Sequence, residues 1–184
     1  MSSSKPLMLK EVRIALSNLD VAKPFKQTPP RFSATFQIDK DSPQAQLLEQ
    51  TIQDVAEAEW PGKGKKKVEE FRNSKQQFCV QDGDDSDFEP AHGTWRLTAH
   101  RNEKHGRPEA RTRKNTPAKP GEIYDGCYVN ASVDIWAQSG ENPGLRCGLV
   151  GVQFVKDGDA FGGARRGDEN LFAPLDVEDD EDDI

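Results

Sequence analysis

Apolar and polar residues alternate along three short stretches in the first 101 residues of the chain. They are segment 11–18 ("EVRIALSN"), segment 31–38 ("RFSATFQI") and segment 94–101 ("TWRLTAHR"). A period of two places successive side chains on opposite faces of an extended strand, so each stretch is predicted to be a strand with one buried face. The first strand is predicted to bury Val12, Ile14 and Leu16.

Two longer strands are predicted in the C-terminal half. Segment 124–138 ("YDGCYVNASVDIWAQ") contains the longest alternation in the chain, with Tyr128 and Trp136 on its polar face. Segment 145–155 ("LRCGLVGVQFV") is predicted to be the last strand. Its alternation slips by one residue near its glycines, as a β-bulge would cause.

Between the second and third strands the period changes from two to that of a helix. Ser42 is a suitable N-cap, Pro43 fits the first helical turn, and apolar residues then follow at helical spacing until Pro61. The sequence therefore predicts one main helix in this region. A basic loop leading into a short helix is predicted over residues 63–71.

Five short strands with one main helix favour a mainly β fold. A sandwich would need about seven strands, so a five-stranded OB-fold barrel with long loops and a disordered acidic C-terminal tail is the predicted architecture. Barrels of this kind usually carry their helix after the third strand, whereas the helix predicted here follows the second. A further strand within residues 65–80 would remove this difference.

Charge divides the chain into a body and a tail. The whole chain carries 25 Lys and Arg against 32 Asp and Glu, but residues 168–184 hold nine acids and no base. The remainder has 23 acids and a net charge of +2. Because blocks of like charge stay unfolded, we predict a flexible leader (1–9), one OB-fold domain (10–160) and a flexible acidic tail (161–184).

Other sequence features indicate the cellular compartment in which the protein is expected. No apolar stretch is long enough to span a bilayer, and the first ten residues have no apolar core of a secretory signal, so we expect neither a membrane partner nor secretion. The three cysteines are odd in number and lack C-x-x-C spacing. This pattern favours buried or unpaired thiols in a reducing cytoplasm and disfavours a zinc site.

The strongest local charge signal is a run of bases within and after the third predicted strand. Only Glu103 and Glu109 oppose eight bases, which gives a local charge of +6 typical of a polyanion binder. A loop kept soluble by its charge is the alternative. The eight bases are Arg96, Arg101, Lys104, Arg107, Arg111, Arg113, Lys114 and Lys119.

Two aromatic residues lie on the polar face of the longest predicted strand. Tyr128 and Trp136 could stack on nucleobases, an interaction worth about 1–3 kcal/mol per base, or could pack beneath a loop or the helix. Trp95 shares the parity of apolar neighbours and is predicted to be in the core. The candidate DNA-binding residues are Arg31, Arg96, His100, Arg101, Lys104, Arg107, Arg111, Arg113, Lys114, Tyr128 and Trp136.

Catalytic and metal-binding patterns are not found in the sequence. The acidic loop 82–93 begins with the spacing of a calcium loop but has Asp87 where glycine is required and Gly93 where the bidentate glutamate should be. The three histidines are too scattered for a metal triad, and no phosphate-binding loop or nucleophile motif occurs. We therefore expect no enzyme activity, no cofactor and no metal; a nuclease that binds metal through this acidic loop is the least favoured alternative.

Several stretches in order resemble a known family. The run from "VRIALSNLDVAKPF" to "PPRFSATFQIDKDS", the later "YDGCYVNASVDIWAQ" and "GVQFVKDGDAFGG", and the acidic tail together resemble the single-stranded DNA-binding proteins of tailed phages. The likeness covers roughly residues 8–184. It implies an OB-fold, sequence-tolerant binding of single-stranded DNA, a role in phage replication or recombination, and a place in the cytoplasm of the bacterial host.

The resemblance also suggests a role for the tail. Its acids could compete with DNA for the basic surface and, once displaced, could bind replication or recombination proteins such as a polymerase, helicase or nuclease. The residues of this predicted partner-binding tail are Asp176, Glu178, Asp179, Asp180, Glu181, Asp182, Asp183 and Ile184. A merely solubilising tail, a binder of double-stranded nucleic acid or RNA, a protein–protein adaptor and a homodimer are left open.

Overall fold

The computed structural model describes residues 2–24 and 26–161, and these residues form a closed β-barrel with helices at its side. The strands are β1 (Leu7–Lys23), β2 (Arg31–Asp39), β3 (Val80–Asp82), β4 (Thr94–Asn102), β5 (Glu109–Arg111), β6 (Tyr128–Gln138) and β7 (Gly144–Lys156). The helices are α1 (Pro43–Glu59) and α2 (Gly64–Phe71), with short 3-10 turns at Gly83–Asp85, Glu89–Ala91 and Glu103–His105. None of these described helices is long and apolar enough to cross a membrane.

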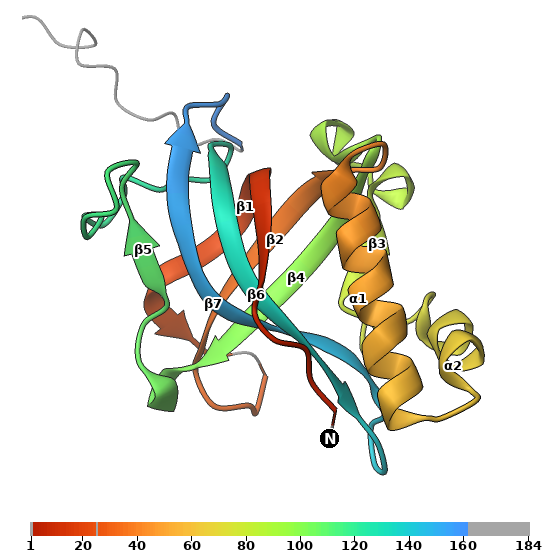
Figure 1. Ribbon diagram of the computed structural model, residues 1–184. Helices are drawn as coiled ribbons and strands as arrows, with labels where there is room; N and C mark the ends of the chain where they lie inside the picture. Colours follow the sequence, from red (N-terminus) through yellow and green to blue (C-terminus); the bar gives the residue numbers. More distant parts are fainter. Residues whose placement is uncertain (1, 25, 162–184) are drawn as a thin grey trace, which may run out of the picture.

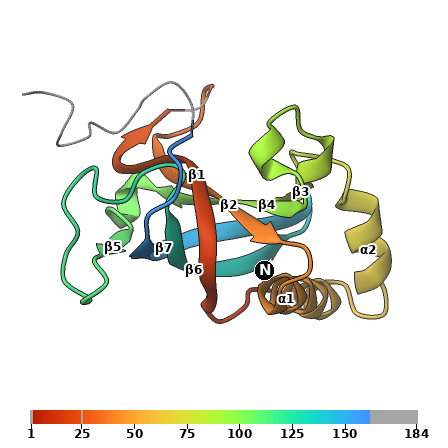
Figure 2. The same cartoon turned by 90° about the horizontal axis from the view of Figure 1, so that it is seen from above.

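Five of the strands close the barrel. β1, β2 and β4 form an antiparallel meander, and β6 joins β1 to β7. The circle closes where β4 meets β7 in parallel at His100 and Gly148. This strand order is that of an OB-fold, so the predicted fold class is confirmed. Figures 1 and 2 show α1 and α2 on one side of the barrel and β5 on the opposite side.

Alternation in the sequence predicted the interior correctly along most strands. The apolar positions of β6 and the alternate positions of β2 are fully or almost fully buried, and the register of β7 shifts between Leu149 and Gly151 as predicted for a bulge. The three cysteines are free and buried, in agreement with the sequence.

The first strand differs from its prediction. Leu16 was expected in the core, but it is 63% exposed because β1 bulges there, with the Leu16 backbone in the left-handed region at φ 48°. A second bulge at Glu11 (φ 52°) shifts the alternation by one residue. These two bulges let one 17-residue strand curl so that its first half pairs with β6 and its second half with β2.

The predicted leader is also corrected. β1 begins at Leu7, and both Leu7 and Leu9 are buried. Before it, the Ser4 N–H donates to the Ile135 carbonyl at 2.7 Å, and Ser3 bridges to Trp136. The described residues of segment 1–9 are therefore part of the barrel. The bulge at Glu11 hid them, because it places Leu7 and Leu9 out of phase with Val12 and Ile14.

The main helix follows its sequence signals. Ser42 Oγ accepts a hydrogen bond from the Ala45 N–H at 3.3 Å, Pro43 opens α1, and the predicted apolar stripe is buried against the barrel. The helix remains between the second and third barrel strands, because β3 is only a short edge strand paired with β4. The predicted partner-binding tail, from Asp176 to Ile184, lies outside the described residues.

Candidate nucleic-acid interface

The outward side of β2 and β4 carries a continuous row of polar side chains, of which Thr35 and Gln37 are buried. Since their apolar side chains fill the interior, the alternate positions must point outward, and antiparallel pairing sets them side by side. This pair of strands is the one that binds oligonucleotides in OB-folds. We call this surface the polar face; it consists of Arg31, Ser33, Thr35, Gln37, Arg96, Thr98, His100 and Asn102.

One end of the polar face continues onto β7 and β6. His100 pairs with Gly148 of β7, and two residues earlier on β7 Arg146 pairs with Trp136 of β6. Burial, followed by the positive charges of Arg31 and Arg146, lowers the pKa of His100 to about 4. His100 is therefore neutral near pH 7. We call the four residues Arg31, His100, Arg146 and Trp136 the basic band.

Arg146 makes no ion pair with a carboxylate of residues 2–24 and 26–161. Its Nη1 donates to the Gln76 carbonyl at 2.8 Å, its Nη2 to the Asn142 carbonyl at 3.0 Å, and its Nε to Gln138 Oε1 at 3.2 Å. Three neutral acceptors fix the plane of the guanidinium but do not neutralise it. Such a fixed cation beside a partly buried indole can bind a phosphate while the ring stacks on a base.

Three polar atoms of the polar face are buried without a partner among the described residues. They are Gln37 Nε2, Arg96 Nε and His100 Nδ1. A buried polar group with no hydrogen bond costs about 1–3 kcal/mol. A ligand that reaches these atoms and offers acceptors would recover part of that cost.

Tyr128 lies far from Trp136, at the other end of β6. Arg13 of β1 pairs with Tyr128 on one side and with Gln37 on the other, so Tyr128 flanks the second end of the polar face. The Tyr128 ring lies between two cations, with the Arg13 guanidinium 5.7 Å and the Lys156 Nζ 4.8 Å from its centroid. The two aromatic side chains predicted to stack bases thus mark opposite ends of one surface.

The remaining basic residues that were predicted to bind DNA lie apart from the polar face. Arg101 has the inward parity of its partner Phe32 and donates to the carbonyls of His105 and Gly106. Arg107 forms an ion pair with Asp20 of β1, and Arg111 pairs with Glu109 at 2.8 Å. Exposed Lys104 lies in the turn after β4, and exposed Arg113 and Lys114 follow β5, which pairs with β7.

The structure therefore divides the predicted binding residues into groups. Arg31, Arg96, His100 and Trp136 come together with the polar face, and Tyr128 borders it. Arg146, Arg13 and Gln37 were not identified from the sequence. A single arginine in an apolar strand has no local feature that shows its cross-strand neighbour. Only the outward parity of Arg146 in "LRCGLV" could have indicated it.

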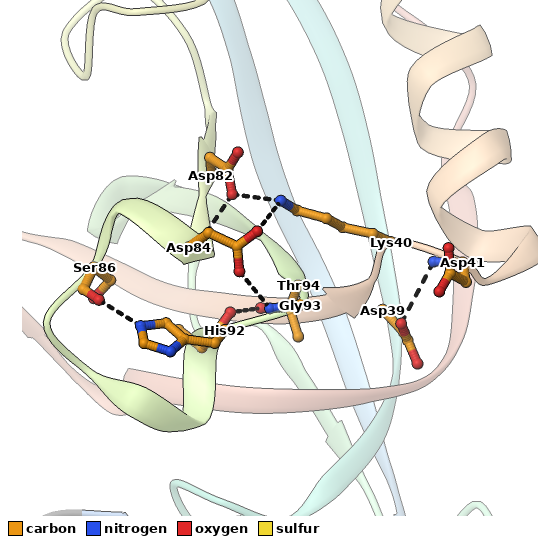
Figure 3. Close-up of polar contacts among 10 residues, drawn as sticks. Asp39, Lys40, Asp41, Asp82, Asp84, Ser86, His92, Gly93 and Thr94 are labelled. Carbon is orange, nitrogen blue, oxygen red and sulfur yellow. Dashed lines mark hydrogen bonds and ion pairs between the residues drawn. The ribbon is translucent and has the colours of Figure 1, made fainter.

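A lysine organises the acidic loop (Figure 3). Lys40 Nζ contacts Asp82 Oδ1 at 2.6 Å and Asp84 Oδ2 at 2.7 Å, and Asp84 Oδ1 accepts from the Gly93 N–H at 2.7 Å. The hydrogen bond that Lys40 donates to Asp82 is the largest cause of the raised pKa of Lys40, and the hydrogen bonds from Lys40 are the largest cause of the lowered pKa values of Asp82 and Asp84. No group of three potential metal ligands is present in the described part of the chain.

Lys40 also contacts an aromatic ring. Its Nζ lies 4.5 Å from the centroid of Trp95, which is half-buried at the margin of the core rather than within it. The contacts of Lys40 hold the acidic loop close to the ends of β2 and β4. This loop carries Phe88, whose ring lies 5.0 Å from that of Phe161.

Comparison with known proteins reveals relatives across nearly the whole chain. A family model described as the single-stranded DNA-binding protein of Enterobacter phage Enc34 matches residues 5–184. Protein p50 of Acyrthosiphon pisum secondary endosymbiont phage 1 is 30% identical over 182 residues, which cover 95% of this chain and 96% of p50.

Solved structures share the fold. The single-stranded DNA-binding protein of bacteriophage Enc34, in complex with single-stranded DNA, has a TM-score of 0.69 and 21% identity, and the match covers 85% of this chain and 89% of that one. Gp2.5, a single-stranded DNA-binding protein encoded by bacteriophage T7, has a TM-score of 0.50 and 14% identity over 90% of this chain and all of its own.

Proposed function

Because the chain belongs to the family of phage single-stranded DNA-binding proteins described for Enterobacter phage Enc34, we propose that it binds single-stranded DNA on the polar face and the basic band. One observation supports this location above the others. The strand pair that binds oligonucleotides in OB-folds carries outward cations and polar atoms that have no partner within the described part of the chain, next to an outward tryptophan.

Binding in this proposal combines phosphate contacts with base stacking. Arg31 and Arg146 bind the backbone, and Trp136 stacks on a base. His100 is neutral, so it does not repel its two cationic neighbours and can hydrogen-bond to the strand. Stacking tolerates any sequence because every base has a π-face. A duplex keeps its bases stacked on one another, so it cannot use Trp136 in this way, which favours single strands over double-stranded DNA.

The acidic tail has a second role in the proposal. Residues 168–184, which lie outside the described residues, carry nine acids and no base. They compete with DNA for the basic band and, when DNA displaces them, bind replication or recombination proteins. The protein acts by binding, without catalysis, in the cytoplasm of the bacterial host during phage replication or recombination.

A titration of three labelled oligomers tests the proposal. Full-length protein is added to single-stranded DNA, double-stranded DNA and single-stranded RNA of equal length at two salt concentrations, and anisotropy and tryptophan fluorescence are recorded. We expect the tightest binding to single-stranded DNA, with quenching that Trp136→Phe largely removes. Equal affinity for the duplex, with no change in tryptophan fluorescence, would reject the proposed mode of binding.

A further inference from the structure

A second aromatic site lies at the end of the polar face opposite the basic band. One wall of this site is the guanidinium of Arg13. Its Nε donates to the Gly126 carbonyl at 2.9 Å and its Nη2 donates to the Asp159 carbonyl at 2.7 Å, and these hydrogen bonds hold it in place. Arg13 makes no ion pair with a carboxylate of the described residues. One face of this planar cation stacks against an aromatic ring.

Phe161 occupies that face. Its ring centroid is 4.0 Å from Arg13 Cζ, and its edge-to-face neighbour is Phe88, 5.0 Å away between centroids at an interplanar angle of 83°. The Phe161 N–H donates to the Asp125 carbonyl at 3.1 Å. An aromatic ring thus contacts both a guanidinium group and a second ring, an arrangement that a nucleobase could equally adopt.

The strand positions beside Arg13 carry hydrogen-bond donors that find no acceptor among the described residues. Gln37 pairs with Arg13 on one side and with Arg96 on the other. The Gln37 side chain is buried, with only 4% of the residue exposed, yet Gln37 Nε2 and Arg96 Nε have no partner in the described part of the chain. A phenyl ring cannot accept hydrogen bonds in its plane, whereas a nucleobase carries acceptors there.

We propose that Arg13 and Phe88 form a nucleobase-binding slot, which Phe161 fills in the free protein and a base of the bound strand fills in the complex. The base stacks on the Arg13 guanidinium, and its exocyclic carbonyl oxygen accepts from Gln37 Nε2 and Arg96 Nε. Thymine, cytosine and guanine have such an oxygen, whereas adenine has an amino group instead. The inference rests on the proposed function and extends it to a base preference.

Two opposite effects on affinity test the slot. In full-length protein, Phe161→Ala removes the internal occupant and should tighten binding to oligo-dT by roughly two- to tenfold. Arg13→Met removes the stacking surface and should weaken it by about fivefold or more. Lys66→Met, which removes one charge from the exposed side of α2, is the matched control and should have a much smaller effect.

A third variant tests the hydrogen bonds. Gln37→Met should lower the ratio of oligo-dT to oligo-dA affinity by about two- to tenfold. Photocrosslinking of an oligo-dT that contains 5-bromodeoxyuridine, followed by peptide mapping, should yield adducts at Phe88 or Tyr128. Thermal unfolding of each variant separates a loss of binding from a loss of fold.

The outcomes distinguish this inference from the proposed function. Wild-type protein that fails to bind single-stranded DNA would reject the function itself. If wild-type protein binds, the slot is rejected when Phe161→Ala leaves affinity unchanged or weaker, or when Arg13→Met behaves like Lys66→Met. An unchanged base preference in Gln37→Met would reject the hydrogen-bonding part of the inference.

Discussion

The basic band and the basic insert (residues 102–122) carry similar side chains in different electrostatic settings. In the insert, the charges of Arg107 and Arg111 are compensated by Asp20 and Glu109. In the band, neutral oxygens hold Arg146, and its positive charge acts on another arginine, Arg31, whose pKa burial and then Arg146 lower. The comparison teaches that the partner of a cation, rather than the density of cations along the sequence, determines where a polyanion is attracted.

The largest expected change in affinity comes from substituting Trp136 of the basic band. Trp136→Leu should weaken binding to single-stranded DNA by about 1–3 kcal/mol, or roughly 5- to 150-fold, because a base loses its stacking surface. Fluorescence anisotropy with labelled oligo-dT measures the change. Trp60→Leu is the control, since Trp60 contacts Phe71 between the helices and should leave affinity unchanged. Equal losses in both variants would assign the effect to stability.

Deleting the acidic tail should have the next largest effect. Removal of residues 168–184 should tighten binding at low salt by roughly tenfold, because nine competing negative charges are lost. The gain should shrink in an Arg146→Met background and persist in an Arg107→Met background. A deletion that weakens binding would refute competition between tail and DNA.

His100 should make both stability and binding depend on pH. Its pKa is lowered to about 4 in the folded protein, so the unfolded chain takes up a proton below about pH 6.5 before the folded chain does. Stability from this residue is therefore present above pH 6.5 and is lost as the pH falls towards 4. Chemical denaturation of wild-type and His100→Gln proteins at pH 7.5 and 5 measures this difference.

A bound phosphate should oppose the lowering of the His100 pKa. By compensating the charges of Arg31 and Arg146, it raises the pKa of His100, so binding takes up a proton. Affinity should then increase about three- to tenfold between pH 7.5 and 5 beyond the change seen in His100→Gln. Parallel pH profiles for the two proteins would show that His100 is not linked to binding.

The smallest effect is expected in the insert. Reversing Arg111 and Arg113 to glutamate should change affinity by less than about threefold at moderate salt, since surface charges away from the site act only through screened long-range attraction. The same two-charge reversal at Lys65 and Lys66 on α2 provides the control. A loss as large as that of Trp136→Leu would move the binding site to the insert.

The barrel was largely predictable from the sequence because its signals are local. The uninterrupted alternation of β6 and the capping of α1 by Ser42 each lie within one element. The bulges of β1 broke such a pattern and concealed Leu7 and Leu9. The position of the helix, after the second barrel strand, was correctly predicted although it departs from the usual order.

The site was less predictable because its signals are non-local. Asp20, which pairs with Arg107, lies 87 residues earlier in the chain, so the sequence overstated the free charge of the insert. Arg146 joins Trp136 across a strand pair and approaches His100 only because β4 and β7 close the barrel. The outward parity of Trp136 was nevertheless correct, and it placed one end of the polar face.

The salt dependence of binding, measured on matched arginine variants, tests the central claim most directly. For single-stranded DNA, each neutralised phosphate contributes about 0.7 to the steepness of the plot of log affinity against log salt concentration. We expect Arg146→Met to lower the slope by about 0.7 and Arg107→Met to leave it nearly unchanged. Equal slopes for the two variants, or a reduction in Arg107→Met alone, would contradict that claim.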